Sequence, residues 1–314
     1  MKATQIFSYG APEVVTVTEV ERPAPGPGEV LVAVGASSVN GHDSLVRAGA
    51  LKIVSGRRFP IGLGLDFAGV VAALGAGSGA VAVGDQVWGT VHPREKHAVA
   101  GAAEFVVVRA DRLGRVPAGM SAVEAAALVV PGITALSALR TATHLAPGET
   151  VLVRGAAGGV GTAAVQLAHA GGGRVTALAR ATHAAALTEL GAAEVLDYRE
   201  TAPEEIGRFD VIVDTVGTDL ARFRRHLTSS GRMVTVGLSP AGIAAIAASA
   251  VFGPRRIRTF SANPLTPQLD ELAAEVARGA IRPVVDAVHQ LADVVAAHRA
   301  FDRGGALGRQ VVAI

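Results

Sequence analysis

The feature that most constrains this chain is a long run in which apolar strands alternate with helices. Apolar strands that alternate with helices form βαβ units, because parallel neighbours need a crossover connection and are buried on both faces. The run therefore predicts an α/β fold with a doubly wound parallel sheet. Its strands are predicted at residues 150–154, 174–179, 194–198, 209–216 and 232–237.

The first of these strands ends in a glycine-rich turn, GAAGGVG. The strict pattern G-x-G-x-x-G is not met, because Ala156 stands at the first glycine position and Gly155 lies one residue earlier. Gly158 would let the backbone approach a pyrophosphate, and Gly161 would let the helix pack closely on the strand. Free N–H groups at the helix N-terminus would meet the phosphates. The turn predicts a Rossmann dinucleotide site, and the alternative is an ordinary βα turn of small residues.

The residue after the second strand bears on coenzyme choice. An acid at this place pairs with the ribose 2′-hydroxyl of NAD, whereas a cation pairs with the 2′-phosphate of NADP. Here Arg180 follows the strand, and no acid lies between Arg174 and Ala186. Tyr198, after the third strand, is placed to flank the same adenosine pocket. The pattern favours NADPH; the alternatives are a solvated Arg180 and a Tyr198 that covers the sheet edge.

Two further loops follow strands of the same sheet. Val216 and Gly217 come after the fourth strand, and Gly237 and Leu238 come after the fifth. Ligands of such sheets bind outside the carboxyl ends of the strands. Small residues there would let a nicotinamide ring lie against the backbone, and plain turns are the alternative.

The rest of the chain predicts a second domain. Short strands separated by glycine fill the first 120 or so residues and are typical of a barrel-like β domain. Ser121 is predicted to cap a long helix together with Glu124. The tail is expected to return to the β domain. We therefore place a β domain at residues 1–122 and 263–314 and a Rossmann domain at residues 123–262.

Composition excludes several other classes. The 314 residues contain no cysteine, which rules out disulfides and thiolate zinc sites. The formal charge is only +2, and no basic run suggests a nucleic-acid partner. The N-terminus has no apolar signal region, and apolar windows such as residues 241–252 are too short to span a bilayer. We expect a cytoplasmic protein without a membrane partner.

Six segments in order span nearly the whole chain. They are SVNGHDSLVRAG (38–49), FPIGLGLDFAGVVAALGAG (59–77), VGDQVWG (83–89), AAALVVPGITALSAL (125–139), the glycine turn, and GALGRQVV (305–312). Together they resemble the zinc-independent quinone oxidoreductase branch of the medium-chain dehydrogenase/reductase superfamily. The resemblance implies a GroES-like catalytic domain beside the Rossmann domain, NADPH as hydride donor, and a homodimer.

The resemblance also assigns site residues. Asn40 and Asp43 are expected to be catalytic, with Asn40 near the nicotinamide and the substrate. The alternative for Asp43 is a structural role, in which it holds its loop or pairs with Arg47. Coenzyme contacts are expected from Asn40, Thr134, Ala157, Gly158, Gly159, Val160, Arg180, Tyr198, Val216, Gly217, Leu238, Phe260, Ala262 and Arg309, the last of which is otherwise a solvated arginine.

No metal site is expected. Zinc-dependent relatives carry a His-Glu pair where this chain has Leu65 and Asp66, and their first Cys ligand where it has Asn40. A catalytic zinc needs three protein ligands, and the histidines and acids present lack that pattern.

The implied activity is transfer of a hydride from NADPH to a small molecule, either a quinone or an α,β-unsaturated ketone. Two departures from the family's sequence pattern bear on the source of the proton that completes the reduction. Gly41 replaces the proline of the first motif, and Leu45 replaces a tyrosine that many quinone reductases have there. The proton donor is then solvent, or no positioned donor is needed; His92 and Lys96 are the alternative donors. The alternatives are an enoyl reductase for polyketide or acyl intermediates and an NADPH-binding relative without turnover.

Overall fold

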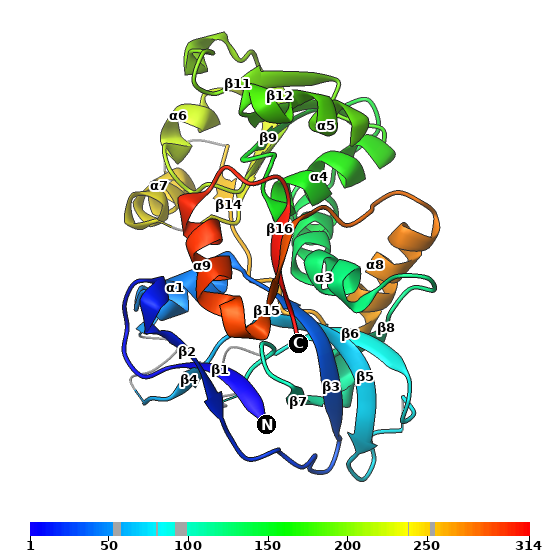
Figure 1. The fold of residues 1–314 in the computed structure, drawn as a ribbon. Coiled ribbons are helices and arrows are strands. Elements are labelled where there is room, and N and C mark those ends of the chain that lie inside the picture. Colours follow the sequence, from blue (N-terminus) through cyan, green and yellow to red (C-terminus); the bar gives the residue numbers. More distant parts are fainter. Residues whose placement is uncertain (53–57, 80, 92–98, 238, 252–254) are drawn as a thin grey trace. The chain divides into compact units, whose positions relative to one another are not determined.

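The chain forms two compact units, which are described separately (Figure 1). Unit 1 comprises Met1–Val130, Asn263–Arg278 and Pro283–Ile314, and unit 2 comprises Pro131–Ala262 and Gly279–Arg282. The computed structural model describes residues 1–52, 58–79, 81–91, 99–237, 239–251 and 255–314. The boundary after residue 130 falls inside the long helix, beyond the boundary that the sequence predicts.

Unit 2 is built on a six-stranded sheet whose neighbours all pair in parallel. The strand order is β11-β10-β9-β12-β13-β14, which is the 3-2-1-4-5-6 order of dinucleotide-binding sheets. The predicted fold class is thereby confirmed. The strands are β9 (Thr150–Arg154), β10 (Arg174–Ala179), β11 (Glu194–Asp197), β12 (Phe209–Asp214), β13 (Leu227–Thr235) and β14 (Ile257–Arg258).

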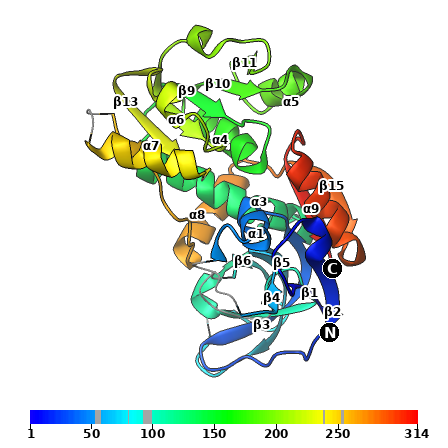
Figure 2. The same ribbon diagram turned by 90° about the vertical axis from the view of Figure 1, so that its left-hand side faces the viewer.

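Helices cover this sheet and bury its apolar strands. Helices α4 (Gly159–Ala170) and α5 (Ala184–Glu189) pack beside β9, β10 and β11 (Figure 2). Helices α6 (Leu220–Arg224) and α7 (Pro240–Val251) pack beside β13 and β14. The central strands carry β-branched and leucine side chains that are fully buried, as strands covered on both faces require.

A long apolar helix begins at the capping residues that the sequence indicates. The Ser121 hydroxyl donates to the Glu124 carboxylate over 2.7 Å, and the Ser121 N–H donates to the same oxygen over 2.9 Å. Helix α3 (Ala122–Leu136) follows and continues as a π-helical segment, Ser137–Ala142. Among the described residues, the helical segment Ala122–Ala142 is long and apolar enough to cross a membrane, judged by length and composition alone. Its most apolar window is 72% buried, as in a core helix.

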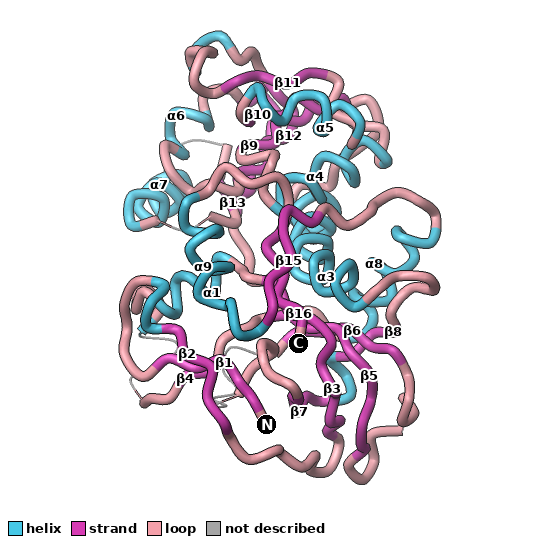
Figure 3. The backbone as a smooth tube through the Cα atoms, viewed as in Figure 1, coloured by secondary structure: helices cyan, strands magenta, loops and turns pink. Residues whose placement is uncertain are grey.

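Unit 1 contains two β-sheets (Figure 3). The small sheet consists of β2 (Val15–Glu19), β1 (Lys2–Ile6) and β4 (Ile61–Gly62). The large sheet runs in the order β15-β16-β3-β5-β6-β8, with β7 pairing on β3. Its strands are β3 (Glu29–Ser38), β5 (Asp66–Leu74), β6 (Gln86–Thr90), β7 (Phe105–Arg109), β8 (Leu113–Arg115), β15 (Val285–Gln290) and β16 (Arg309–Ala313).

The end of the chain returns to this large sheet. Strand β16 pairs antiparallel with β3, with Val311 opposite Ser38. The end of β3, the start of β5 and the start of β16 therefore meet, which brings together polar residues far apart in the sequence. The described residues of this unit also include α1 (Gly41–Arg47), α8 (Thr266–Ala277), α9 (Val294–Arg303) and the first part of α3.

Candidate functional site: a dinucleotide edge and a buried charge cluster

The carboxyl ends of the six parallel strands of unit 2 share one edge of the sheet, where ligands of such folds bind. Most coenzyme residues predicted for this unit directly follow a strand. Thr134 is an exception, because it lies buried in α3, and Leu238 lies outside the described residues. Those at the edge are Ala157, Gly158, Gly159 and Val160 after β9, Arg180 after β10, Tyr198 after β11, Val216 and Gly217 after β12, and Phe260 and Ala262 after β14.

The glycines of the turn after β9 have different physical roles. Gly155 adopts a left-handed φ of +74°, which only glycine adopts at little cost. A Cβ on Gly161 would lie 2.2 Å from the Gly155 carbonyl oxygen, so the helix packs directly on the turn. A Cβ on Gly158 would meet only one atom within 4 Å, the same oxygen at 3.6 Å. Gly158 is exposed and is the N-cap of α4, so its open side leaves room for a phosphate at the helix N-terminus.

Arg180 and Tyr198 meet at this edge. The Arg180 Nε donates to the Tyr198 hydroxyl over 3.0 Å, although 18 residues separate them in the chain. Tyr198 keeps half of its surface exposed, so the pair borders open space. An acid that the sequence reasoning overlooked, Asp197, accepts from the Ala181 and Arg199 N–H groups, each over 2.8 Å. These N–H groups hold the pKa of Asp197 below its usual range, so it stays ionised and braces the Arg180 loop.

A buried ion pair joins the ends of β9 and β12. Arg154 and Asp214 lie opposite each other in the register of the two strands, and Arg154 Nη1 donates to Asp214 Oδ2 over 2.7 Å. The other carboxylate oxygen accepts from the N–H groups of Val216 (3.2 Å) and Gly217 (2.6 Å). It also accepts from the Thr235 hydroxyl at the end of β13, over 3.0 Å. The pair thus ties together three strand ends.

Sequence reasoning missed this pair, although a signal was present. Both residues end apolar strands, TVLVR and FDVIVD, and they carry opposite charges. Adjacent parallel strands bring such terminal residues side by side, and a buried charge needs a partner. Arg154 and Asp214 could therefore have been paired from the sequence.

Unit 1 contains a second buried network, at the junction of β3, β5 and β16. Asp66 has no exposed surface, and its carboxylate accepts from the Ser38 N–H and hydroxyl, each over 2.6 Å. The Asn40 side-chain N–H₂ donates to Asp66 over 2.9 Å and to the Ser38 carbonyl over 3.0 Å. Arg309 Nη2 donates to the Ser38 hydroxyl over 2.6 Å and to the Asn40 side-chain oxygen, and it lies 3.8 Å from Asp66.

Burial dominates the electrostatics of this cluster. It raises the pKa of Asp66 to about 6, although the Arg309 charge and the hydrogen bonds from Ser38 and Asn40 act in the opposite direction. Burial also lowers the pKa of Arg309. A guanidinium stays charged over the working pH range, so Arg309 is a fixed buried cation whose counter-ion titrates near neutrality.

This geometry changes how three predicted site residues are understood. Both side-chain hydrogens of Asn40 are engaged within unit 1, which leaves none for an acceptor oxygen. Asp43 accepts from the Asn40 and Gly64 N–H groups and holds the start of α1. Arg309 is 6% exposed and turned toward Ser38 and Asn40, which does not favour a phosphate contact. The catalytic roles of Asn40 and Asp43 remain predictions, and the contacts described here are structural ones.

Other predicted groups are placed as follows. Arg47, considered as a partner of Asp43, instead forms an ion pair with Asp302 at 2.5 Å. Of the two tyrosines in the sequence, Tyr198 lies at the adenosine edge, whereas Tyr9 packs edge-on against Phe59, with ring centroids 5.0 Å apart. His92 and Lys96 lie outside the described residues. Within the ranges that the structure describes, no group of three His, Cys, Asp or Glu side chains could hold a metal ion.

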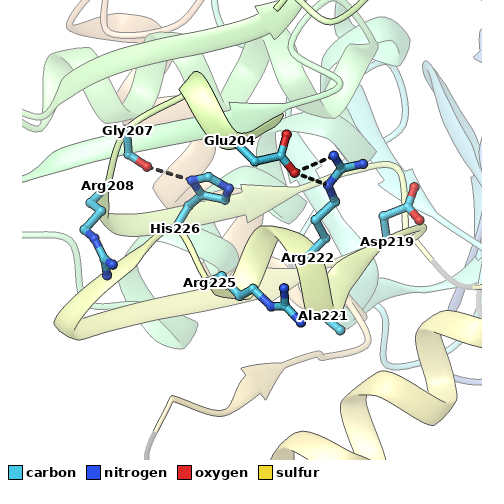
Figure 4. A pocket seen from close by; sticks show the side chains of 8 residues that line it. All are labelled: Glu204, Gly207, Arg208, Asp219, Ala221, Arg222, Arg225 and His226. Atoms are coloured by element: carbon cyan, nitrogen blue, oxygen red, sulfur yellow. Dashed lines mark hydrogen bonds and ion pairs between the residues drawn. The ribbon is translucent and has the colours of Figure 1, made fainter. Parts of the chain in front are cut away.

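A separate pocket of about 750 Å³ opens beside α6 (Figure 4). Arg222 pairs with Glu204 at 2.6 Å, and His226 Nδ1 lies 2.7 Å from the Gly207 carbonyl oxygen. Several of its residues directly precede β12 or β13, so it belongs mainly to the edge at which these strands begin. None of the predicted site residues lines it. The lining consists of Glu204, Gly207, Arg208, Asp219, Ala221, Arg222, Arg225 and His226.

Two known protein families match segments of this chain. Residues 26–118 match the family described as alcohol dehydrogenase GroES-like domain, and residues 190–312 match that described as zinc-binding dehydrogenase. The chain is 31% identical to the mitochondrial NAD(P)H oxidoreductase RTN4IP1 of Mus musculus, over 99% of this chain and 89% of that protein.

Solved structures give the same result. The quinone oxidoreductase from Coxiella burnetii is similar with a TM-score of 0.92 and 30% identity, covering 100% of this chain and 99% of that one. The Escherichia coli quinone oxidoreductase complexed with NADPH has a TM-score of 0.87 and 26% identity, with 100% of each chain covered. With a GroES-like unit, a Rossmann unit and relatives of this kind over nearly its whole length, the chain belongs to the medium-chain dehydrogenase/reductase superfamily and has quinone oxidoreductases among its homologues.

Proposed function

We propose that this protein is an NADPH-dependent reductase that acts on a quinone or on an α,β-unsaturated carbonyl compound. The observation that carries the proposal is the carboxyl edge of the unit 2 sheet. There an open glycine turn, a helix N-terminus and an arginine held by a tyrosine lie after three adjacent strands. Relatives named as NAD(P)H and quinone oxidoreductases support the same activity.

The residues present fit a dinucleotide. The open side of Gly158 and the N-terminus of α4 would hold the pyrophosphate, and Arg180 would pair with the 2′-phosphate. Val216 has an exposed side chain after β12, where an apolar ring could rest. When bound, NADPH supplies a hydride, which carries two electrons to the acceptor.

The protein's side chains would orient the reactants, and no tyrosine would donate the proton. The chain has only two tyrosines, of which Tyr9 packs on Phe59 and Tyr198 contacts Arg180. Solvent would therefore supply the proton that completes the reduction. A quinone would then leave as the hydroquinone, and an enone as the saturated ketone, with the hydride on its β-carbon and the proton on its α-carbon.

Coenzyme selectivity tests the adenosine part of the proposal. Arg180→Ala is expected to raise the KM for NADPH about tenfold or more, because a charge-assisted hydrogen bond to phosphate is lost. The KM for NADH should hardly change, because NADH has no 2′-phosphate. Initial rates with each coenzyme at a saturating acceptor concentration measure both values.

Two control variants sharpen this test. Arg174→Ala removes the same charge from the opposite end of β10 and should leave both KM values unchanged. Tyr198→Phe removes the hydroxyl that orients Arg180. It should raise the KM for NADPH by less than Arg180→Ala does and leave the KM for NADH unchanged. Equal losses for both coenzymes in Arg180→Ala would show that Arg180 does not recognise the 2′-phosphate.

Turnover tests the reaction class. Oxidation of NADPH, followed by its absorbance, is expected with some member of a panel of quinones and enones. Turnover only with enoyl thioesters would instead identify an enoyl reductase of acyl or polyketide chains. Binding of NADPH without oxidation by any acceptor would identify a binding protein that lacks turnover.

A further inference from the structure

The Arg154–Asp214 pair lies under the loop that joins β12 to α6. Its side chains belong to the ends of the two central strands, and both are buried. Asp214 holds the first half of the loop through the Val216 and Gly217 N–H groups. Arg154 holds the second half, because its Nη1 donates to the Thr218 carbonyl oxygen and its Nη2 donates to the Thr218 hydroxyl over 3.0 Å.

The loop has few alternatives to these contacts. It contains two left-handed residues, Gly217 at φ +81° and Asp219 at φ +51°. The left-handed conformation is unfavourable for a residue other than glycine, so Asp219 persists in it only where its surroundings fix it. The Arg154 guanidinium also lies 4.0 Å over the Phe223 ring of α6, which adds a cation–π contact at the far end of the loop.

The loop also touches the end of β13. A Cβ on Gly237 would lie 2.5 Å from the Gly217 nitrogen, so the two backbones are in direct contact. The Ser239 hydroxyl donates to the Gly217 carbonyl oxygen over 2.7 Å. A shift at Thr218 would therefore be transmitted to the ends of both β12 and β13, which the sequence predicts to contact the nicotinamide half of the coenzyme.

We propose that Arg154 is a positioning residue that sets the nicotinamide-side wall of the coenzyme site through the Thr215–Asp219 loop. This rests on the proposed NADPH site. Other residues support the adenosine side. Arg180 and Tyr198 follow β10 and β11, and Asp197 is the last residue of β11, on the other side of β9 from β12. Loss of Arg154 should thus weaken binding of the nicotinamide half of the coenzyme and leave binding of the adenosine half unchanged.

Equilibrium binding of two ligands separates the halves. NADPH contains both, whereas 2′,5′-ADP contains only the adenosine half with its 2′-phosphate. Arg154→Gln is expected to raise the Kd for NADPH about tenfold and to leave the Kd for 2′,5′-ADP unchanged. Arg154→Lys keeps the charge without the planar fork and should give an intermediate loss.

Arg232→Gln is the matched control. Arg232 forms an ion pair with Glu149 at 2.6 Å and donates to the Thr143 carbonyl oxygen, but it does so near the opposite end of β9. This variant should lose stability without changing the ratio of the two Kd values. Thr218→Val removes only one acceptor of Arg154, so it should raise the Kd for NADPH by less and leave the Kd for 2′,5′-ADP unchanged. This variant provides the test if Arg154→Gln does not fold.

The outcomes distinguish this inference from the function on which it rests. Failure of the unaltered protein to bind NADPH would reject the proposed function itself. Normal binding by that protein, with equal losses or no losses for both ligands in Arg154→Gln, would reject only the positioning role. If Arg154→Gln cannot be purified folded, the absence of a selective loss in Thr218→Val would reject it.

Discussion

Gly161→Ala is expected to destabilise unit 2 by about 3 kcal/mol, because overpacking against backbone cannot be relieved by side-chain rotation. The added Cβ would lie 2.2 Å from the Gly155 carbonyl oxygen and 2.7 Å from the Ala156 Cα. That backbone is itself fixed, since the Ala156 N–H donates to β10 through the Leu178 carbonyl over 3.3 Å. Urea unfolding followed by far-UV circular dichroism measures the loss.

Gly158→Ala is the control for this prediction. Gly158 has an ordinary φ of −71°, and the nearest atom to its Cβ position lies at 3.6 Å, so stability should hardly change. The same methyl group would occupy the space proposed for the pyrophosphate, and NADPH binding should weaken. Equal stability losses in the two variants would contradict the packing role of Gly161. Unchanged binding in Gly158→Ala would instead remove the pyrophosphate from this turn.

The parallel sheet and the adenosine edge could be predicted from sequence because they depend on local patterns. Each strand of unit 2 is a short apolar run, and β9 and β10 have the predicted bounds. Parallel pairing then places residues after adjacent strands side by side, which brings Arg180 to Tyr198. The strands on the other side of β9 agree less well. Strand β13 begins at Leu227 rather than at residue 232, because Leu227 also pairs with Phe209 of β12.

The cluster in unit 1 could not be derived from local patterns. Ser38 and Arg309 lie 271 residues apart, and they meet only because β16 pairs with β3. No periodicity within either segment specifies that pairing. The resemblance placed Arg309 near a phosphate, whereas burial and the need of Asp66 for a counter-ion account for its orientation in the structure.

Arg309→Met is expected to cost about 3–5 kcal/mol at pH 8, because it leaves a buried carboxylate without its cation. Asp66 has no exposed surface on which water could replace the guanidinium, and the Asn40 side-chain oxygen also loses its donor. Trp88 is the only tryptophan and is buried in β6 of unit 1. Its fluorescence during urea unfolding therefore reports the stability of the affected unit.

The loss should be smaller at pH 5 than at pH 8. The pKa of Asp66 is about 6 in the fold and 3.8 as its ordinary value. Its contribution to stability is therefore greatest below pH 3.8, falls as the pH rises to about 6, and is constant above. Without Arg309, whose charge lowers this pKa, the fall continues above pH 6. Each unit of further rise in the pKa adds about 1.4 kcal/mol to the loss at high pH.

Two control variants assign this loss and its pH dependence to the Asp66–Arg309 pair, the first by the size of the loss and the second by its pH dependence. Arg47→Met also removes a buried arginine of unit 1, but its partner Asp302 keeps 33% of its side chain exposed. Water can solvate that carboxylate, so the loss at pH 8 should be smaller. Burial and the Arg47 charge keep the pKa of His298 below 6.5, so this histidine is neutral at pH 8 and does not affect the comparison there. The double variant Asp66→Asn/Arg309→Met removes both charges and should lose the pH dependence. A loss in Arg309→Met that is equal at pH 5 and pH 8 would mean that the Arg309 charge does not control the titration of Asp66 in this range, and that hydrogen bonds rather than charge hold the junction of β3, β5 and β16.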